Sequence, residues 1–174
     1  MGVSSSVRVS LKFDQTGGSD FGPQRFEGEV ARLLQFGSGT TANNANLLFV
    51  DERSVAASTS DPLDLAGVLS DAMGTTFAAA EIVAILVINA PISPSNAANT
   101  SNLTVGGGTN PVVGYLGGTT PTIGPIRPGG MVLLANPDAS GLATVTAGTG
   151  DILNIANGSG GTAVYQVAIL ARTA

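Results

Sequence analysis

The chain has 174 residues, which suits one domain, and 43% of them are hydrophobic while only 11% are charged. Seven basic against twelve acidic residues give a formal charge of −5, so the chain lacks the basic surface on which nucleic-acid binding or attachment to an anionic membrane depends. The absence of cysteine and histidine excludes disulfides, thiolate ligands and Ser-His-Asp triads. So little charge predicts a surface covered by other protein, or one rich in Ser, Thr, Asn and Gly.

The first predicted element is a strand with two unlike faces. Its apolar residues alternate with Arg, Ser and Lys, so one face is apolar and the other solvated; they are Val7, Val9, Leu11 and Phe13. Residues 15–23 predict a loop, and residues 25–36 a second strand, because Gly28 disfavours a helix there. Two roles stay open for residues 1–25: a strand of the domain's own sheet, or an arm that adds to a neighbour's sheet.

The middle of the chain alternates between loops and apolar runs. Residues 37–46 predict a polar loop, and residues 47–58 a strand broken near Asp51. Residues 64–74 fit either a short helix or a pair of turns. Residues 81–89 are apolar on both faces and β-branched, which predicts a central strand buried on both sides.

Short apolar runs separated by turn residues fill the rest of the chain, at about residues 102–107, 111–116, 131–136, 142–147, 151–156 and 163–171. This spacing predicts an all-β protein, a sandwich or a barrel, in a single domain over residues 1–174 with short turns and at most one short helix. The glycines of residues 124–161 lie between strands without a lysine or a following helix, so they predict turns and no phosphate site. Asn157-Gly158 is typical of a hairpin turn.

The search for chemistry predicts no catalytic residue, no cofactor and no metal. Asp61, Asp64 and Asp71 offer oxygen ligands for calcium, but their spacing fits no EF-hand loop and favours turn capping. Glu27 with Glu29 is a conceivable glycosidase-like pair, yet the strand face that carries them is polar throughout. We therefore expect a protein that is not an enzyme.

The order of turn motifs from residue 47 to residue 171 resembles a family of small structural proteins of tailed bacteriophages; the motifs are LDLAGVLSDAMGTTF, EIVAILVINA, LTVGGG, IRPGG, NPDASG, TVTAGTGDILNIAN and YQVAILA. The resemblance implies a virion component made in the host cytoplasm and folded as a jelly-roll-like β-sandwich, with a capsid decoration (cement) protein as the expected role. Such a subunit binds the outside of the major capsid protein shell and stabilises it, as a homotrimer in preference to a dimer. Partners would be the capsid protein and copies of itself, with no nucleic acid and no membrane.

Two other functional classes remain as alternatives. One is a tail or fibre adhesin that binds carbohydrate, although carbohydrate sites favour aromatic side chains and the chain has no Trp, two Tyr and six Phe. The other is a hydrolase with paired carboxylates. For the decoration role, the candidate contacts with a neighbouring subunit or the capsid are Arg127, Val112, Val113, Tyr115 and Leu116.

Overall fold

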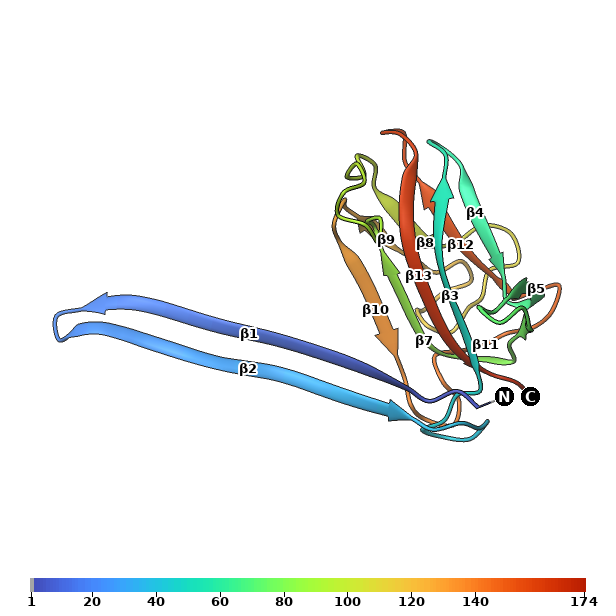
Figure 1. Cartoon of the computed structure of the whole chain (residues 1–174), viewed down its shortest axis with the longest axis horizontal. Helices are drawn as coiled ribbons and strands as arrows, with labels where there is room; N and C mark the ends of the chain where they lie inside the picture. Colours follow the sequence, from blue (N-terminus) through green and yellow to red (C-terminus); the bar gives the residue numbers. More distant parts are fainter. Residues whose placement is uncertain (1) are drawn as a thin grey trace.

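The structure is a computed structural model that describes residues 2–174. These residues form thirteen β-strands and no helix, so the all-β prediction is confirmed. Most strands belong to a body of antiparallel sheets that do not close into a barrel, and the first two leave this body as a long arm (Figure 1). Residues 2–174 contain no helix of the length and hydropathy needed to cross a lipid bilayer.

The arm is an antiparallel hairpin of β1 (Ser5–Ser19) and β2 (Gly22–Phe36). The strand predicted over residues 25–36 is confirmed, but the loop predicted over residues 15–23 is wrong in most of its length, because only Asp20 and Phe21 lie outside the strands. Each residue from Gln15 to Ser19 has a partner on β2, and this pairing outweighs the local turn preference of glycine. Fifteen residues per strand make the arm about 50 Å long.

One sheet of the body, here called the front sheet, has the strand order β10 (Met131–Ala135), β7 (Glu81–Ile88), β13 (Ala163–Arg172), β3 (Leu47–Val55). The short β11 (Ala143–Thr144) also pairs with β7, beyond the end of β10. The central position predicted for residues 81–89 is confirmed, but burial on both sides is not, because Leu86 and Ile88 on the outer side are partly exposed. No break occurs at Asp51, because this residue pairs with Val167 inside the β3–β13 ladder.

The second sheet, the back sheet, has the order β4 (Ser60–Asp64), β12 (Ile152–Asn157), β8 (Leu103–Gly106), β9 (Thr122–Ile126), and β5 (Ala66–Ser70) pairs with β6 (Thr76–Ala78) separately. The region that fitted a helix or turns is therefore strand up to Ser70. Only Leu65 lies outside β4 and β5 in this stretch, and the pairing of Leu69 with Phe77 and of Ser70 with Thr76 holds the stretch in strand conformation.

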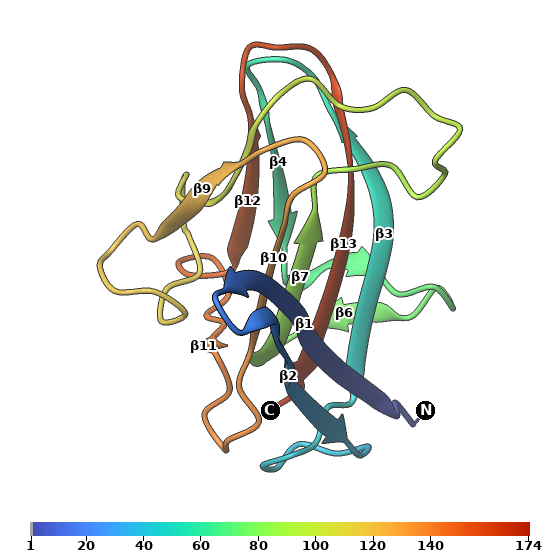
Figure 2. The same cartoon turned by 90° about the vertical axis from the view of Figure 1, so that its left-hand side faces the viewer.

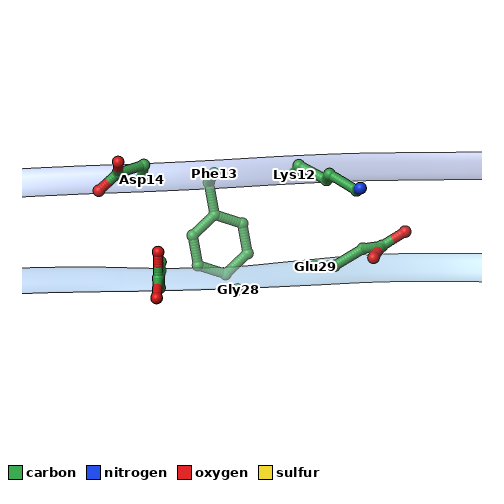
Figure 3. Close-up of a pocket in the computed structure, with 6 residues that line it drawn as sticks. Lys12, Phe13, Asp14, Gly28 and Glu29 are labelled. Atoms are coloured by element: carbon green, nitrogen blue, oxygen red, sulfur yellow. The ribbon is translucent and has the colours of Figure 1, made fainter.

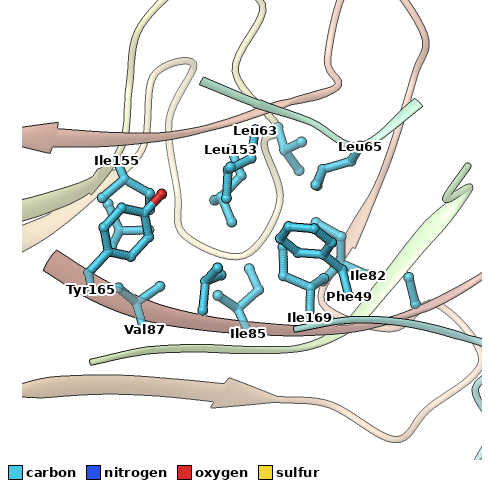
Figure 4. Packing of buried hydrophobic residues seen from close by; sticks show 14 of the residues in the cluster. Phe49, Leu63, Leu65, Ile82, Ile85, Val87, Leu153, Ile155, Tyr165 and Ile169 are labelled. Atoms are coloured by element: carbon cyan, nitrogen blue, oxygen red, sulfur yellow. The ribbon is translucent and has the colours of Figure 1, made fainter. Parts of the chain in front are cut away.

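The core lies between the two sheets (Figure 4). Tyr165, Val167 and Ile169 of β13 point inward and face Leu153 and Ile155 of β12. The run at residues 111–116 forms no strand, although its Val112 is fully buried in this core.

The hairpin predicted at Asn157-Gly158 is wrong, since β12 and β13 belong to different sheets. Asn157 instead stabilises the connection from β12 to β13, because its side-chain amide donates to the carbonyls of Val55, Ala56 and Gly161. The turn at residues 136–141 is as expected, and its Gly141 has a φ of +61° where a Cβ would collide with the carbonyl of Ile82.

Candidate interaction site

The two faces of the arm differ in chemistry. Residues paired across an antiparallel ladder share a face. One face, here called the arm apolar face, consists of Val7, Val9, Leu11, Phe13, Gln15, Phe26, Gly28, Val30, Arg32 and Leu34. Its apolar side chains beyond the root of the arm are exposed, with Leu11 at 65% and Val30 at 67%. The two-faced strand that the alternation predicted is thus confirmed, and its apolar face lies open along the arm.

The opposite face of the arm carries charges that neutralise one another. Arg25 binds Asp14 at 2.7 Å and Glu27 at 3.1 Å, and the Ser10 hydroxyl donates to Glu29. The hydrogen bonds that Arg25 donates to the Asp14 carboxylate raise the pKa of Arg25. Glu27 and Glu29, the conceivable carboxylate pair, therefore lie on an exposed strand face beside their polar partners.

The aromatic side chains of the arm apolar face are ordered by a glycine. The ring of Phe13 lies across Gly28 on the partner strand (Figure 3). A Cβ on Gly28 would come within 2.7 Å of the Phe13 ring, so a side chain there would displace it. Phe13 also stacks on Phe26, with ring centroids 5.5 Å apart. Together they present a flat apolar surface in the outer half of the arm.

The front sheet is apolar on its outer side as well as in the core. Alternate residues of its strands face outward, away from the back sheet. They form what is here called the front-sheet outer face: Leu48, Val50, Glu52, Ser54, Ala84, Leu86, Ile88, Met131, Leu133, Ala135, Val164, Gln166, Ala168 and Leu170. Eleven of these fourteen residues are apolar, and Val50 and Met131 are more than half exposed. Sheets that face water usually alternate apolar with polar residues, so this face has the composition of a buried one.

The arm begins at one end of this outer face. Val7 and Leu34 at its root pack on a small cluster that includes Ala84 and Leu170 of the front sheet and Phe36 at the end of β2. Beyond the root the arm leaves the sheet, and Figure 2 looks along it onto the strands of the front sheet. Two grooves, of about 320 and 590 Å³, lie in the angle between arm and sheet. The two apolar faces therefore meet at the root and diverge from it.

A buried arginine holds the segment that joins the arm to the body. Arg172 at the end of β13 is 0% exposed. Its guanidinium donates to the carbonyls of Asn44, Asp138 and Ala139 and forms an ion pair with Glu81 at 3.0 Å. This binds the residue 37–46 loop to β7 and to the turn after β10, so the root of the arm rests on a rigid support.

The aspartates considered for calcium have other partners. Asp64 accepts the amide of Ala66, and Asp71 accepts the amides of Met73 and Thr75, which is the turn capping that their positions predicted. Asp61 instead forms an ion pair with Arg53 at 2.6 Å. In residues 2–174, no three acidic side chains lie together as a metal site would require.

Asp61 links the two sheets, because it lies on β4 while Arg53 lies on β3 and Tyr165 on β13. The Tyr165 hydroxyl donates to Asp61 at 2.7 Å. Burial acts to raise the pKa of Asp61, but the hydrogen bonds from Arg53 and Tyr165 outweigh it and the pKa is lowered. Burial and the hydrogen bond that Tyr165 donates to Asp61 raise the pKa of Tyr165, and the hydrogen bonds that Arg53 donates to Asp61 raise the pKa of Arg53.

The contact residues predicted from the sequence lie elsewhere. Arg127 is exposed between β9 and β10, and Val113 is exposed, whereas Val112 is in the core and Tyr115 and Leu116 are half-buried. None belongs to the arm apolar face or the front-sheet outer face, so their role as contacts stays a prediction. The front-sheet outer face was not predicted from the sequence, although the apolar character of residues 81–89 on both sides was a signal of it.

Comparison with known proteins adds no relative: no family model, no curated protein and no solved structure matches the chain.

Proposed function

We propose that the protein is a structural subunit of a virion, a capsid decoration protein that binds the outside of the major capsid protein shell and stabilises it. The observation that carries the proposal is the arm, an extended hairpin whose apolar face is open to solvent along most of its length. An isolated two-stranded hairpin is only marginally stable in water. Such an arm therefore suits a subunit that is completed by the assembly it joins.

The size of the exposed surface supports the same role. A compact folded protein of 17.2 kDa exposes about 7,800 Å². This chain exposes 9418 Å². The excess of about 1,600 Å² is about twice the area that each partner buries in a standard protein–protein interface. Many weak contacts of this kind, repeated over a shell, add up to firm attachment.

The proposal includes the jelly-roll-like connectivity expected of such a subunit and its place on the virion surface. Arg127 and Val113, both exposed on the body, remain the proposed contacts of the body with the shell or a neighbour. A strand-by-strand comparison with a solved structure of the assembled particle would test both points.

Shells that lack the protein provide the functional experiment. Purified protein is added to such shells, and binding is measured by co-sedimentation while shell stability is measured by thermal melting. We expect saturable binding and a higher melting temperature of the shell. The double variant Leu11→Lys, Val30→Lys should bind at least tenfold more weakly, and Ser10→Lys, Ala31→Lys on the opposite face of the arm is its matched control. Absence of binding by the unaltered chain would refute the proposal.

A further inference from the structure

We infer that the arm apolar face of one copy of this chain packs on the front-sheet outer face of a second copy, so that subunits are joined by exchanged arms. The inference concerns the contact between copies of the chain. It goes beyond the proposed function, because this contact does not depend on whether the protein binds a capsid shell. Both surfaces belong to the same chain, and each has apolar side chains open to solvent, such as Leu11 on the arm and Val50 and Met131 on the front sheet.

The same two faces already contact each other at the root of the arm. There Val7 and Leu34 of the arm apolar face pack with Ala84, Ala135 and Leu170 of the front-sheet outer face. This shows that the side chains of the two faces pack together. The exchanged contact would extend it along the remaining apolar residues of the arm.

The rest of the arm points away from its own front sheet. The arm extends far from the body, and residues such as Leu11 and Val30 lie beyond the root where the chain contacts itself (Figure 1). A second copy brings an uncovered front-sheet outer face to this part of the arm. A closed symmetric oligomer covers every arm and every face in this way, because each copy contributes one of each.

Charge and area also favour a second copy. On the described strands that form the two faces, the arm apolar face has one charged residue, Arg32, and the front-sheet outer face has one, Glu52, of opposite sign. The excess surface of about 1,600 Å² exceeds the roughly 800 Å² that each partner buries in a standard interface. Packing of one apolar sheet on another at a spacing of about 10 Å is the ordinary mode of such burial.

The chain contains no cysteine, so single cysteines can report this contact. Leu11→Cys and Val30→Cys place a thiol on the arm apolar face, and Leu86→Cys and Leu133→Cys place one on the front-sheet outer face. Each arm variant is mixed with each face variant, oxidised and analysed by non-reducing electrophoresis. Ser10→Cys on the opposite face of the arm is the control, and sedimentation equilibrium of the unaltered chain gives the oligomeric state.

We expect an oligomer in sedimentation and a disulfide-linked pair of chains for at least one arm–face mixture, at ten times or more the yield with Ser10→Cys. Three results would overturn the inference: a monomer at every concentration, equal yields with the Ser10 control, or cross-links of Leu11→Cys only with itself, which would mean that arms pack on arms. Cross-linking in the expected pattern by a chain that binds no capsid shell would retain this inference and refute the proposed function. Shell binding by a chain that gives no arm–face cross-links would support the proposed function and refute this inference.

Discussion

Leu11 and Val30 lie directly opposite each other in the middle of the arm, and about two-thirds of each side chain is exposed. Cross-strand apolar pairs normally stabilise a sheet by burying one side of it. This pair buries little, because no second layer covers it in the single chain. The pair therefore contributes little to the fold of the subunit, and the first prediction follows from this.

Replacement of Leu11 and Val30 by lysine should leave the body intact. We expect the free energy of unfolding of the body to change by no more than about 0.5 kcal/mol, as for other exposed positions. Leu153→Ala in the core should lower it by about 2–5 kcal/mol. Urea unfolding at a protein concentration low enough to avoid assembly measures both. A loss in the arm variant as large as that of Leu153→Ala would mean that the arm is part of the folding core.

The tip of the arm should report assembly through proteolysis. Phe21 is 100% exposed in a two-residue turn, which is a favourable site for chymotrypsin. We expect the isolated subunit to be cleaved there first and the assembled protein to be cleaved at least tenfold more slowly. Mass spectrometry of the fragments over time measures this. First cleavage within the body would contradict the arrangement.

The link between the sheets should weaken in acid. The folded-state pKa of Asp61 lies below its ordinary value of 3.8, so its stabilising effect is present above that value and is lost as the pH falls through the folded-state pKa. At pH 7, Asp61→Asn should cost about 2 kcal/mol of the free energy of unfolding, because Arg53 and Tyr165 lose a charged acceptor. The difference between variant and unaltered chain should shrink below pH 4 in urea unfolding. A difference that is constant from pH 7 to pH 2.5 would rule out this explanation.

Arg172→Lys should loosen the root of the arm. A lysine cannot reproduce the forked hydrogen bonds to Asn44, Asp138 and Ala139. We expect a loss of about 3 kcal/mol in the free energy of unfolding and faster amide hydrogen exchange in residues 37–46. The exposed Arg25→Lys is the matched control and should change stability by less than about 1 kcal/mol. Unchanged exchange in residues 37–46 would show that Arg172 does not hold this loop.

The hydrophobic periodicity of the sequence predicts most of the strands but says little about which strands pair with one another. Alternation at Val7–Phe13 predicted a two-faced strand, and the continuous apolar run at residues 81–89 predicted the centre of a sheet, because both patterns are set by side chains close in sequence. The loop expected at residues 15–23 is strand, since partners on β2 determine its conformation. The hairpin expected at Asn157-Gly158 fails for a related reason: β12 and β13 cross between sheets and find other partners.

The candidate site depends on such long-range pairing. The sequence left open whether the N-terminal residues join their own sheet, and the register of β1 with β2 decides that they form an arm of residues 5–36. The front-sheet outer face could not be listed from sequence, because it comes from alternate residues of four strands whose order is non-local. The direction of the arm depends on contacts such as those of Arg172, which span the chain from residue 44 to residue 172.

Image reconstruction of particles made with the full chain and with a chain that lacks residues 5–36 tests the central claim most directly. With the full chain, we predict density for the two-sheet body on the outer surface of the capsid shell, with arms reaching from one copy to the next. With the shortened chain, this density should be lost or greatly reduced. Absence of the body from the shell in both preparations, or full occupancy without the arm, would contradict the account.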